Sequence, residues 1–210
     1  MKVAYFGESP ADRAALRIFT EAILRRPTEQ VPHAGLEHRG WPAVKGPLPA
    51  ILKQLHYHTD ADGFVFVVDS NGDPPHLPAH ESAPEPRCRL CRLRGIAAET
   101  MAKVRPRAHM EPLKIALGLA VPAIEAWLLC GLDPHVSEAA WITGLKEPPG
   151  RMPYSKGGLK RQLYGSSYAS LPVMTEAMKT AAERLAHDLT TLERLFPAGF
   201  GALANALRNW

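Results

Sequence analysis

Apolar runs and amphipathic stretches alternate along the N-terminal part of the chain and predict strands separated by helices. Residues 2–6 (KVAYF) have the pattern of a short buried strand, and residues 14–26 repeat apolar side chains at helical spacing. Residues 63–68 (GFVFVV) and 114–121 (KIALGLAV) are continuous apolar runs, typical of strands covered on both faces. This order predicts an α/β fold in which a parallel, Rossmann-like sheet is flanked by helices.

The remaining segments predict further elements and a division of the chain. A second strand is expected near Gly35–Arg39. Helices are expected at Leu48–Tyr57, at Cys88–Val104, from Pro122 onward, at Lys156–Tyr164, at Pro172–Arg194 and in a final segment ending at Trp210. We therefore expect an α/β domain (1–150), with a Pro-, His- and Cys-containing insert at about 74–110, and a helical C-terminal extension packed on it (151–210).

Composition narrows the class of protein. Of 210 residues, 46% are hydrophobic and 22% are charged, which fits one globular domain and indicates neither disorder nor a membrane protein. The start, MKVAYFGESP, lacks the long apolar stretch and cleavage site of a secretory signal, so we expect a cytoplasmic chain without membrane contact. The three cysteines are an odd number in such a chain, which argues against a disulfide framework.

Acidic side chains follow the predicted strands. Glu8 comes after the first strand, Asp69 ends the GFVFVV strand with Asp73 four residues on, and Glu125 follows the KIALGLAV strand. Parallel strands end at one edge of a sheet, where open α/β folds bind ligands. Oxygen ligands suit Mg²⁺ or Mn²⁺, which can activate water at a phosphate. The alternative is that these residues only form turns and helix caps.

These motifs resemble the toprim domain of topoisomerases, primases and OLD-family nucleases. The resemblance rests on GESPAD, which carries Glu8 and Asp12, and on the strand with its acidic pair, FVVDSNGD. AVPAIEAWLL, YSKGGLK and FPAGFGAL are similar to segments of small stand-alone toprim proteins related to the OLD nucleases. Such proteins are often encoded beside an ABC-type ATPase and associated with phage defence, so the resemblance implies an ATPase partner.

The resemblance also implies roles for residues at the acidic pair. Glu8 corresponds to the family's general acid/base or metal-binding glutamate, and Asp69 to the first aspartate of its Asp-x-Asp pair. Asn71 stands where the family has the second aspartate, and a neutral amide binds magnesium more weakly than a carboxylate. Asp73, two residues later, is the candidate substitute.

Three further residues complete the implied site. Glu125 matches the glutamate of the family's Glu-Ala-Trp segment and would hold a second metal ion. Lys156, or else Lys160, would stabilise the charge on the phosphate; the alternative for Lys156 is an exposed loop lysine. The implied activity is a divalent-metal-dependent nuclease that hydrolyses phosphodiesters in DNA or RNA. The rival, favoured by Asn71, is an inactive toprim-like module that binds nucleic acid or nucleotide or regulates an ATPase.

The insert carries a second candidate metal site. His76, His80, Cys88 and Cys91 form the pattern H-x3-H-x7-C-x2-C. Paired imidazole and thiolate ligands are what tetrahedral Zn²⁺ requires, and a structural zinc ion would order a loop poor in apolar residues. The spacing is irregular for a zinc motif, and chance proximity among nine histidines is the alternative.

Basic residues concentrate after this pattern. The chain has 25 Lys and Arg against 21 Asp and Glu, with a pI of about 9.1. A stretch with few opposing acids could neutralise phosphates of a nucleic acid, or it could be the solvated face of a helix. A zinc-ordered basic helix that docks on nucleic acid or protein is therefore another hypothesis, and the C-terminal helices could also form a homodimer. The candidate nucleic-acid contacts are Arg89, Arg92, Arg94, Arg105 and Arg107.

Overall fold

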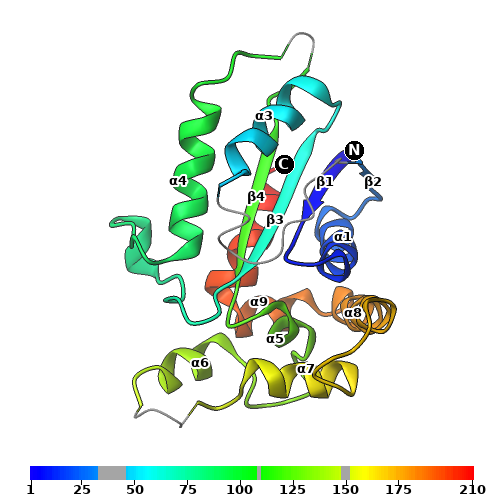
Figure 1. Cartoon of the computed structure of the whole chain (residues 1–210), viewed down its shortest axis with the longest axis vertical. Coiled ribbons are helices and arrows are strands. Elements are labelled where there is room, and N and C mark those ends of the chain that lie inside the picture. Colours follow the sequence, from blue (N-terminus) through cyan, green and yellow to red (C-terminus); the bar gives the residue numbers. More distant parts are fainter. Residues whose placement is uncertain (33–45, 108–109, 148–151) are drawn as a thin grey trace.

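A computed structural model describes residues 1–32, 46–107, 110–147 and 152–210. Its centre is a four-stranded, wholly parallel sheet with the strand order β2-β1-β3-β4 (Figure 1). This arrangement confirms the expected Rossmann-like α/β class. The strands are β1 (Lys2–Phe6), β2 (Glu29–Gln30), β3 (Gly63–Asp69) and β4 (Lys114–Ala120).

The register of the sheet brings the strand ends together. Val3 of β1 lies opposite Gly63 of β3, which lies opposite Lys114 of β4. Every residue of β3 is buried, as its unbroken apolar run predicts, and its last residue, Asp69, lies opposite Ala120. Because all strands run in one direction, the segments that follow β1, β3 and β4 emerge at one edge.

One face of the sheet is covered by α1 (Pro10–Leu24) and the C-terminal helix α10 (Ala202–Arg208), and α8 (Leu171–Ala186) packs against α1. The rings of Phe19 and Phe200 pack edge to face with their centroids 5.1 Å apart, and the rings of Trp127 and Phe200 do so at 5.3 Å. The C-terminal segment therefore shares the main hydrophobic core with the N-terminal helix.

The other face is covered by α3 (Leu48–His58) and α4 (Arg89–Met101) (Figure 1). Phe6, Phe64 and Phe66 fill this second core and contact one another edge to face or at a tilt. Both helices match the amphipathic segments expected from the sequence. The strand expected near Gly35–Arg39 lies outside the described residues.

The remaining elements lie at the end of the molecule to which the strands point (Figure 1). They are the helices α5 (Ile124–Leu128), α6 (Glu138–Gly144), α7 (Lys156–Tyr164) and α9 (Leu189–Leu195), and a single π-helical turn, η2 (Pro197–Gly201). The short helix η1 (Pro78–Glu81) lies to the side, next to the N-terminal end of α4 (Figure 1). None of the helices in the described parts of the chain combines the length and the apolar character that a bilayer crossing needs.

Two expected helices differ in the structure. The predicted helix Pro172–Arg194 is divided, because the side chain of Asp188 accepts a hydrogen bond from the Thr191 backbone N–H at 3.1 Å and starts α9 as a separate helix. The helix after β4 does not begin at Pro122, since Ala123 is its N-cap and Ile124 its first residue. That helix is also shorter than the apolar segment predicts.

Candidate functional site

Three acidic residues from different strand ends converge at the carboxyl edge of the sheet. Glu8 follows β1, Asp69 ends β3, and Glu125 lies in the first turn of α5, after β4. The backbone N–H of Asp69 donates to Glu8 Oε1 at 3.3 Å, and the N–H of Ile124 donates to Asp69 Oδ1 at 3.0 Å. The structure thus brings together the residues that the pattern of strand ends indicated; we call this group the acidic edge.

Lys156 reaches the acidic edge from the first turn of α7. Its Nζ lies 2.5 Å from Asp69 Oδ2 and donates to Asn71 Oδ1 at 2.8 Å. The Ser155 side chain caps α7 by accepting a hydrogen bond from the Gly158 N–H at 3.1 Å. This cap fixes the start of the helix, whose first residue is Lys156. Burial lowers the pKa of Lys156, but the carboxylates of Asp69, Glu8 and Glu125 together raise it above its usual value, so this lysine stays charged. It is therefore part of the site and not an exposed loop residue.

Tyr164 is a site residue that the sequence reasoning missed. Its hydroxyl donates to Glu125 Oε1 at 3.1 Å, and Lys160 Nζ lies 3.9 Å from the same oxygen. Lys156, Lys160 and Tyr164 follow one another at intervals of four residues, which places them on one face of α7. That spacing is the signal by which Tyr164 could have been found.

The acidic edge carries negative charge that burial makes costly. Burial raises the pKa of Glu8 and of Glu125, and the neighbouring charge of Asp69 raises both further. Burial and Asp69 also raise the pKa of Asp12 to about 7, although Ser9 donates to this carboxylate. Glu125 Oε2 is buried without a hydrogen-bond partner among the described residues. A bound cation would relieve this charge.

Arg89, which is buried, and Asp73, which is half-buried, form an ion pair beside the acidic edge. Arg89 Nε donates to Asp73 Oδ2 at 2.6 Å and its Nη1 to the Asp69 carbonyl at 2.8 Å, while Glu8 lies 3.8 Å away. Only 8% of Arg89 is exposed, so the structure places this candidate nucleic-acid contact inside the protein and not on its surface. The Asp73 carboxylate, expected to replace the missing aspartate, is engaged by Arg89.

The insert forms the second candidate centre, and it can hold a metal ion. One potential ligand atom from each of His76, His80, Cys88 and Cys91 lies within 4.8 Å of the others. Elsewhere in the described ranges, no further group of three or more His, Cys, Asp or Glu meets this criterion, so the carboxylates of the acidic edge are more widely spaced. We call these four residues the His/Cys cluster.

The His/Cys cluster is arranged for ligation through one nitrogen of His76. His76 Nδ1 lies 3.5 Å from both Cys88 Sγ and Cys91 Sγ, and its Nε2 is paired with Glu81 Oε1 at 2.9 Å. Arg94 donates to the same Glu81 oxygen at 2.7 Å. Burial lowers the pKa of His76, so its imidazole is neutral and able to bind a metal.

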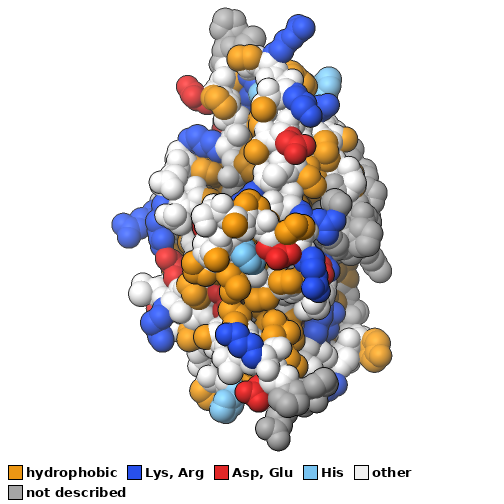
Figure 2. Space-filling model, turned by 90° about the vertical axis from the view of Figure 1, so that its left-hand side faces the viewer, with side chains coloured by type: hydrophobic (Ala, Val, Ile, Leu, Met, Phe, Trp, Pro, Cys, Tyr) orange, Lys and Arg blue, Asp and Glu red, His pale blue; other side chains and the backbone are white. Residues whose placement is uncertain are grey.

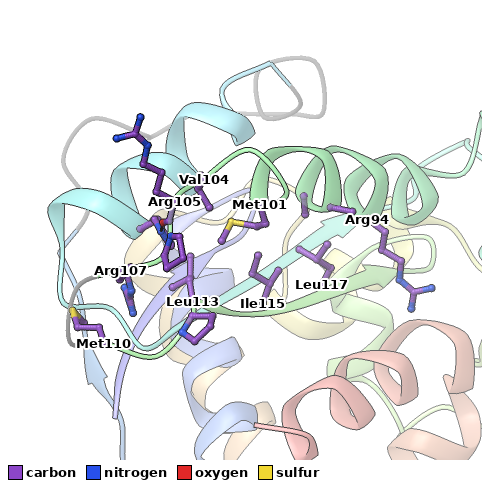
Figure 3. A pocket seen from close by; sticks show the side chains of 14 residues that line it. Arg94, Met101, Val104, Arg105, Arg107, Met110, Leu113, Ile115 and Leu117 are labelled. Atoms are coloured by element: carbon purple, nitrogen blue, oxygen red, sulfur yellow. Dashed lines mark hydrogen bonds between the residues drawn. The ribbon is translucent and has the colours of Figure 1, made fainter.

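A groove between α4 and β4 is lined by three of the candidate nucleic-acid contacts, Arg94, Arg105 and Arg107. Its volume is about 560 Å³, and Figure 3 shows Met101, Ile115 and Leu117 along it, with Arg94 at one end and Arg107 at the other. Arg105 also lines it, whereas Arg92 does not. From the α4 side, hydrophobic side chains form much of the middle of the surface and are interrupted by Lys and Arg (Figure 2).

Comparison of the chain with protein-family models, with curated proteins and with solved structures found no match.

Proposed function

We propose that the chain is a divalent-metal-dependent nuclease that hydrolyses phosphodiesters in DNA or RNA at the acidic edge. The observation that carries this proposal is the convergence of Glu8, Asp69 and Glu125 from three strand ends, with Lys156 paired to the central acid. The resemblance of GESPAD and FVVDSNGD to toprim motifs supports the same chemistry. The resemblance of AVPAIEAWLL, YSKGGLK and FPAGFGAL to small stand-alone toprim proteins supports an ATPase partner in phage defence. Carboxylates supply metal ligands, and a fixed ammonium group stabilises charge on a phosphate.

The donors at the acidic edge fit Mg²⁺ or Mn²⁺. Glu8, Asp69 and Glu125 offer carboxylate oxygens, Asn71 offers an amide oxygen, and the buried Glu125 Oε2 lacks a hydrogen-bond partner among the described residues. Hard cations of this kind prefer oxygen ligands and keep several waters, so a closely packed cage is not required. When bound, the ion supplies an activated water and neutralises charge on the phosphate.

The chain's own residues would prepare this site. Lys156 holds Asp69 and Asn71 in one orientation, and the N–H of Ile124 fixes the other oxygen of Asp69. Tyr164 orients Glu125 through its hydroxyl. Burial keeps water scarce around these carboxylates, which strengthens their interaction with a cation and with phosphate.

The first test is cleavage of labelled single- and double-stranded DNA and RNA with Mg²⁺ or Mn²⁺. Glu8→Gln and Asp69→Asn each remove a charge without changing shape, and we expect each to lower cleavage at least about 100-fold. Glu176→Gln, on the exposed side of α8, is the control and should cleave normally. Equal cleavage by wild type and both acid variants would place the activity elsewhere or in a contaminant.

A second candidate function is binding without cleavage. It is favoured by Asn71 at the position of the second aspartate and by Lys156, which already neutralises Asp69. In this case wild type would bind nucleic acid or nucleotide but leave it intact, both alone and with an ATPase partner. Binding assays run beside the cleavage assay distinguish the two functions.

For the His/Cys cluster we propose a structural Zn²⁺ ion. In a tetrahedral zinc site, sulfur and nitrogen ligands lie about 3.5 Å apart, which agrees with the 3.5 Å from His76 Nδ1 to each thiol sulfur. His80 Nδ1 accepts from the Leu77 N–H at 3.3 Å, which leaves its Nε2 for the metal. Metal analysis of protein purified without a His tag should find about one equivalent of zinc; less than about a tenth would refute the site.

A further inference from the structure

The His/Cys cluster is joined to the acidic edge through very short stretches of chain. Cys88 and Cys91 flank Arg89 in the first turn of α4, and Asp73 lies three residues before His76. Arg89 and Asp73 are the two partners of the ion pair beside the acidic edge. A metal ion bound by all four residues of the cluster would therefore hold the two segments that carry this ion pair.

We propose that a zinc ion in the His/Cys cluster positions Arg89 and the loop of residues 70–73 for the acidic edge, so that zinc content controls the state of that site. The proposal rests on the proposed function in taking the acidic edge as the working site and the His/Cys cluster as a zinc site. Arg89 is the connecting residue, because its guanidinium binds the Asp73 carboxylate and the Asp69 carbonyl and lies 3.8 Å from Glu8. It acts through these neighbours and is a positioning residue.

Contacts outside the ligand set favour a rigid connection. His76 Nε2 is paired with Glu81, which is held in turn by Arg94 of α4. A carboxylate on the second nitrogen of a metal-bound histidine fixes the ring orientation and strengthens the metal bond. This contact directs Nδ1 toward the thiols of Cys88 and Cys91. Metal binding would therefore fix the start of α4, where Arg89 is the first residue.

The loop that Arg89 contacts has backbone N–H groups whose hydrogen exchange can be measured. The N–H of Ser70 donates to the Ala120 carbonyl at 2.7 Å, that of Asn71 to the Pro122 carbonyl at 2.9 Å, and that of Asp73 to the Ser70 carbonyl at 2.9 Å. Amide hydrogen exchange at these positions measures how often the loop opens. It needs neither substrate nor divalent metal at the acidic edge.

The experiment compares amide exchange in zinc-loaded protein with that in protein stripped of zinc by a chelator. We expect exchange at residues 70–73 to be at least about tenfold faster after zinc removal, while the β3 amides of residues 64–68 stay protected and show that the sheet is intact. Cys91→Ser should lose zinc and give the same result. Arg89→Gln should keep zinc and still release the loop, which separates positioning by Arg89 from mere loss of the metal. Cys130→Ala, which removes the thiol outside the cluster, should change neither zinc content nor exchange at the loop.

Three outcomes overturn the proposal: no zinc in the purified protein, loop exchange that does not respond to zinc removal, or loop exchange that responds to zinc but not to Arg89→Gln. The cleavage assay is read separately. If wild type does not cleave nucleic acid, but amide exchange at residues 70–73 responds both to zinc removal and to Arg89→Gln, the coupling stands and the nuclease assignment fails. If wild type cleaves at the acidic edge while amide exchange at residues 70–73 does not change on zinc removal, the nuclease assignment stands and the coupling fails.

Discussion

Glu138, the first residue of α6, is a buried carboxyl that the acidic edge does not explain. Its Oε2 accepts from the Ala198 N–H at 2.9 Å, while Oε1 is buried without a hydrogen-bond partner among the described residues. Burial raises its pKa to about 7 from a usual value of 4.5, and the backbone N–H groups of Ala198 and Gly199 offset only part of that shift. At pH values below about 7 the carboxyl joins α6 to η2 in its neutral form.

This pKa predicts that stability falls as the pH rises. Between pH 4.5 and 7 the unfolded chain gives up the Glu138 proton while the folded chain retains it, so the free energy of unfolding decreases, by about 3 kcal/mol over the range. Glu138→Gln removes this dependence: relative to wild type, the variant should gain about that much between pH 4 and pH 8 in urea unfolding. Exposed Glu183→Gln is the control. If the free energy of unfolding changes with pH in the same way for Glu138→Gln and wild type, the prediction is contradicted.

Lys156 allows a prediction in which binding and cleavage change in opposite directions. Its ammonium group occupies Asp69 and Asn71, the oxygens proposed for the metal, and so competes with Mn²⁺. Lys156→Gln should bind Mn²⁺ about tenfold more tightly, yet cleave at least about 100-fold more slowly, because the charge that stabilises the phosphate is lost. Calorimetric titration measures the first effect. Exposed Lys53→Gln is the control, and unchanged or weaker Mn²⁺ binding in Lys156→Gln would show that the lysine does not compete.

The π-helical turn η2 approaches the backbone of β4 closely at Gly199. A Cβ added at Gly199 would lie 2.3 Å from the Leu119 carbonyl oxygen of β4, whereas at Gly201 the nearest atoms lie at 3.7 Å. Backbone cannot move aside as a side chain can, so Gly199→Ala should lower the free energy of unfolding by about 1–3 kcal/mol. Gly201→Ala, whose backbone is helical, should have little effect. Thermal melts of the two variants decide; equal melting temperatures would mean that η2 does not pack closely on β4.

The elements also show how far the sequence alone could predict the structure. Apolar periodicity predicted β1, β3, β4, α3 and α7 close to their observed bounds, since each is a complete amphipathic or buried segment. It could not predict the break before α9, which depends on one capping side chain, Asp188. It placed Glu8, Asp69 and Glu125 at one edge because parallel strands end together. The Arg89–Asp73 pair joins a loop to a helix start, and no periodicity reports such a contact.

At the scale of the whole molecule, residues 151–210 are part of the core and not an appendage to it. Phe196, Phe200, Leu203 and Leu207 are fully buried in the same cluster as Phe19 of α1. The last residue, Trp210, lies over Gly63 of β3, where an added Cβ would approach its ring to 2.4 Å. Both ends of the chain thus stabilise the sheet on which the acidic edge depends.

This shared core predicts that residues 1–150 do not fold alone. Removing the C-terminal helices would expose large apolar side chains of α1 and α5, and each buried Phe or Leu that is lost costs about 1.5–3 kcal/mol. Several such losses exceed the 5–15 kcal/mol that typically separates folded from unfolded domains. Circular dichroism should show no cooperative melt for 1–150, and mixing it with a 151–210 peptide should restore one, because the same contacts can form between separate chains. A cooperative melt of 1–150 alone would instead show that the N-terminal part is an independent domain.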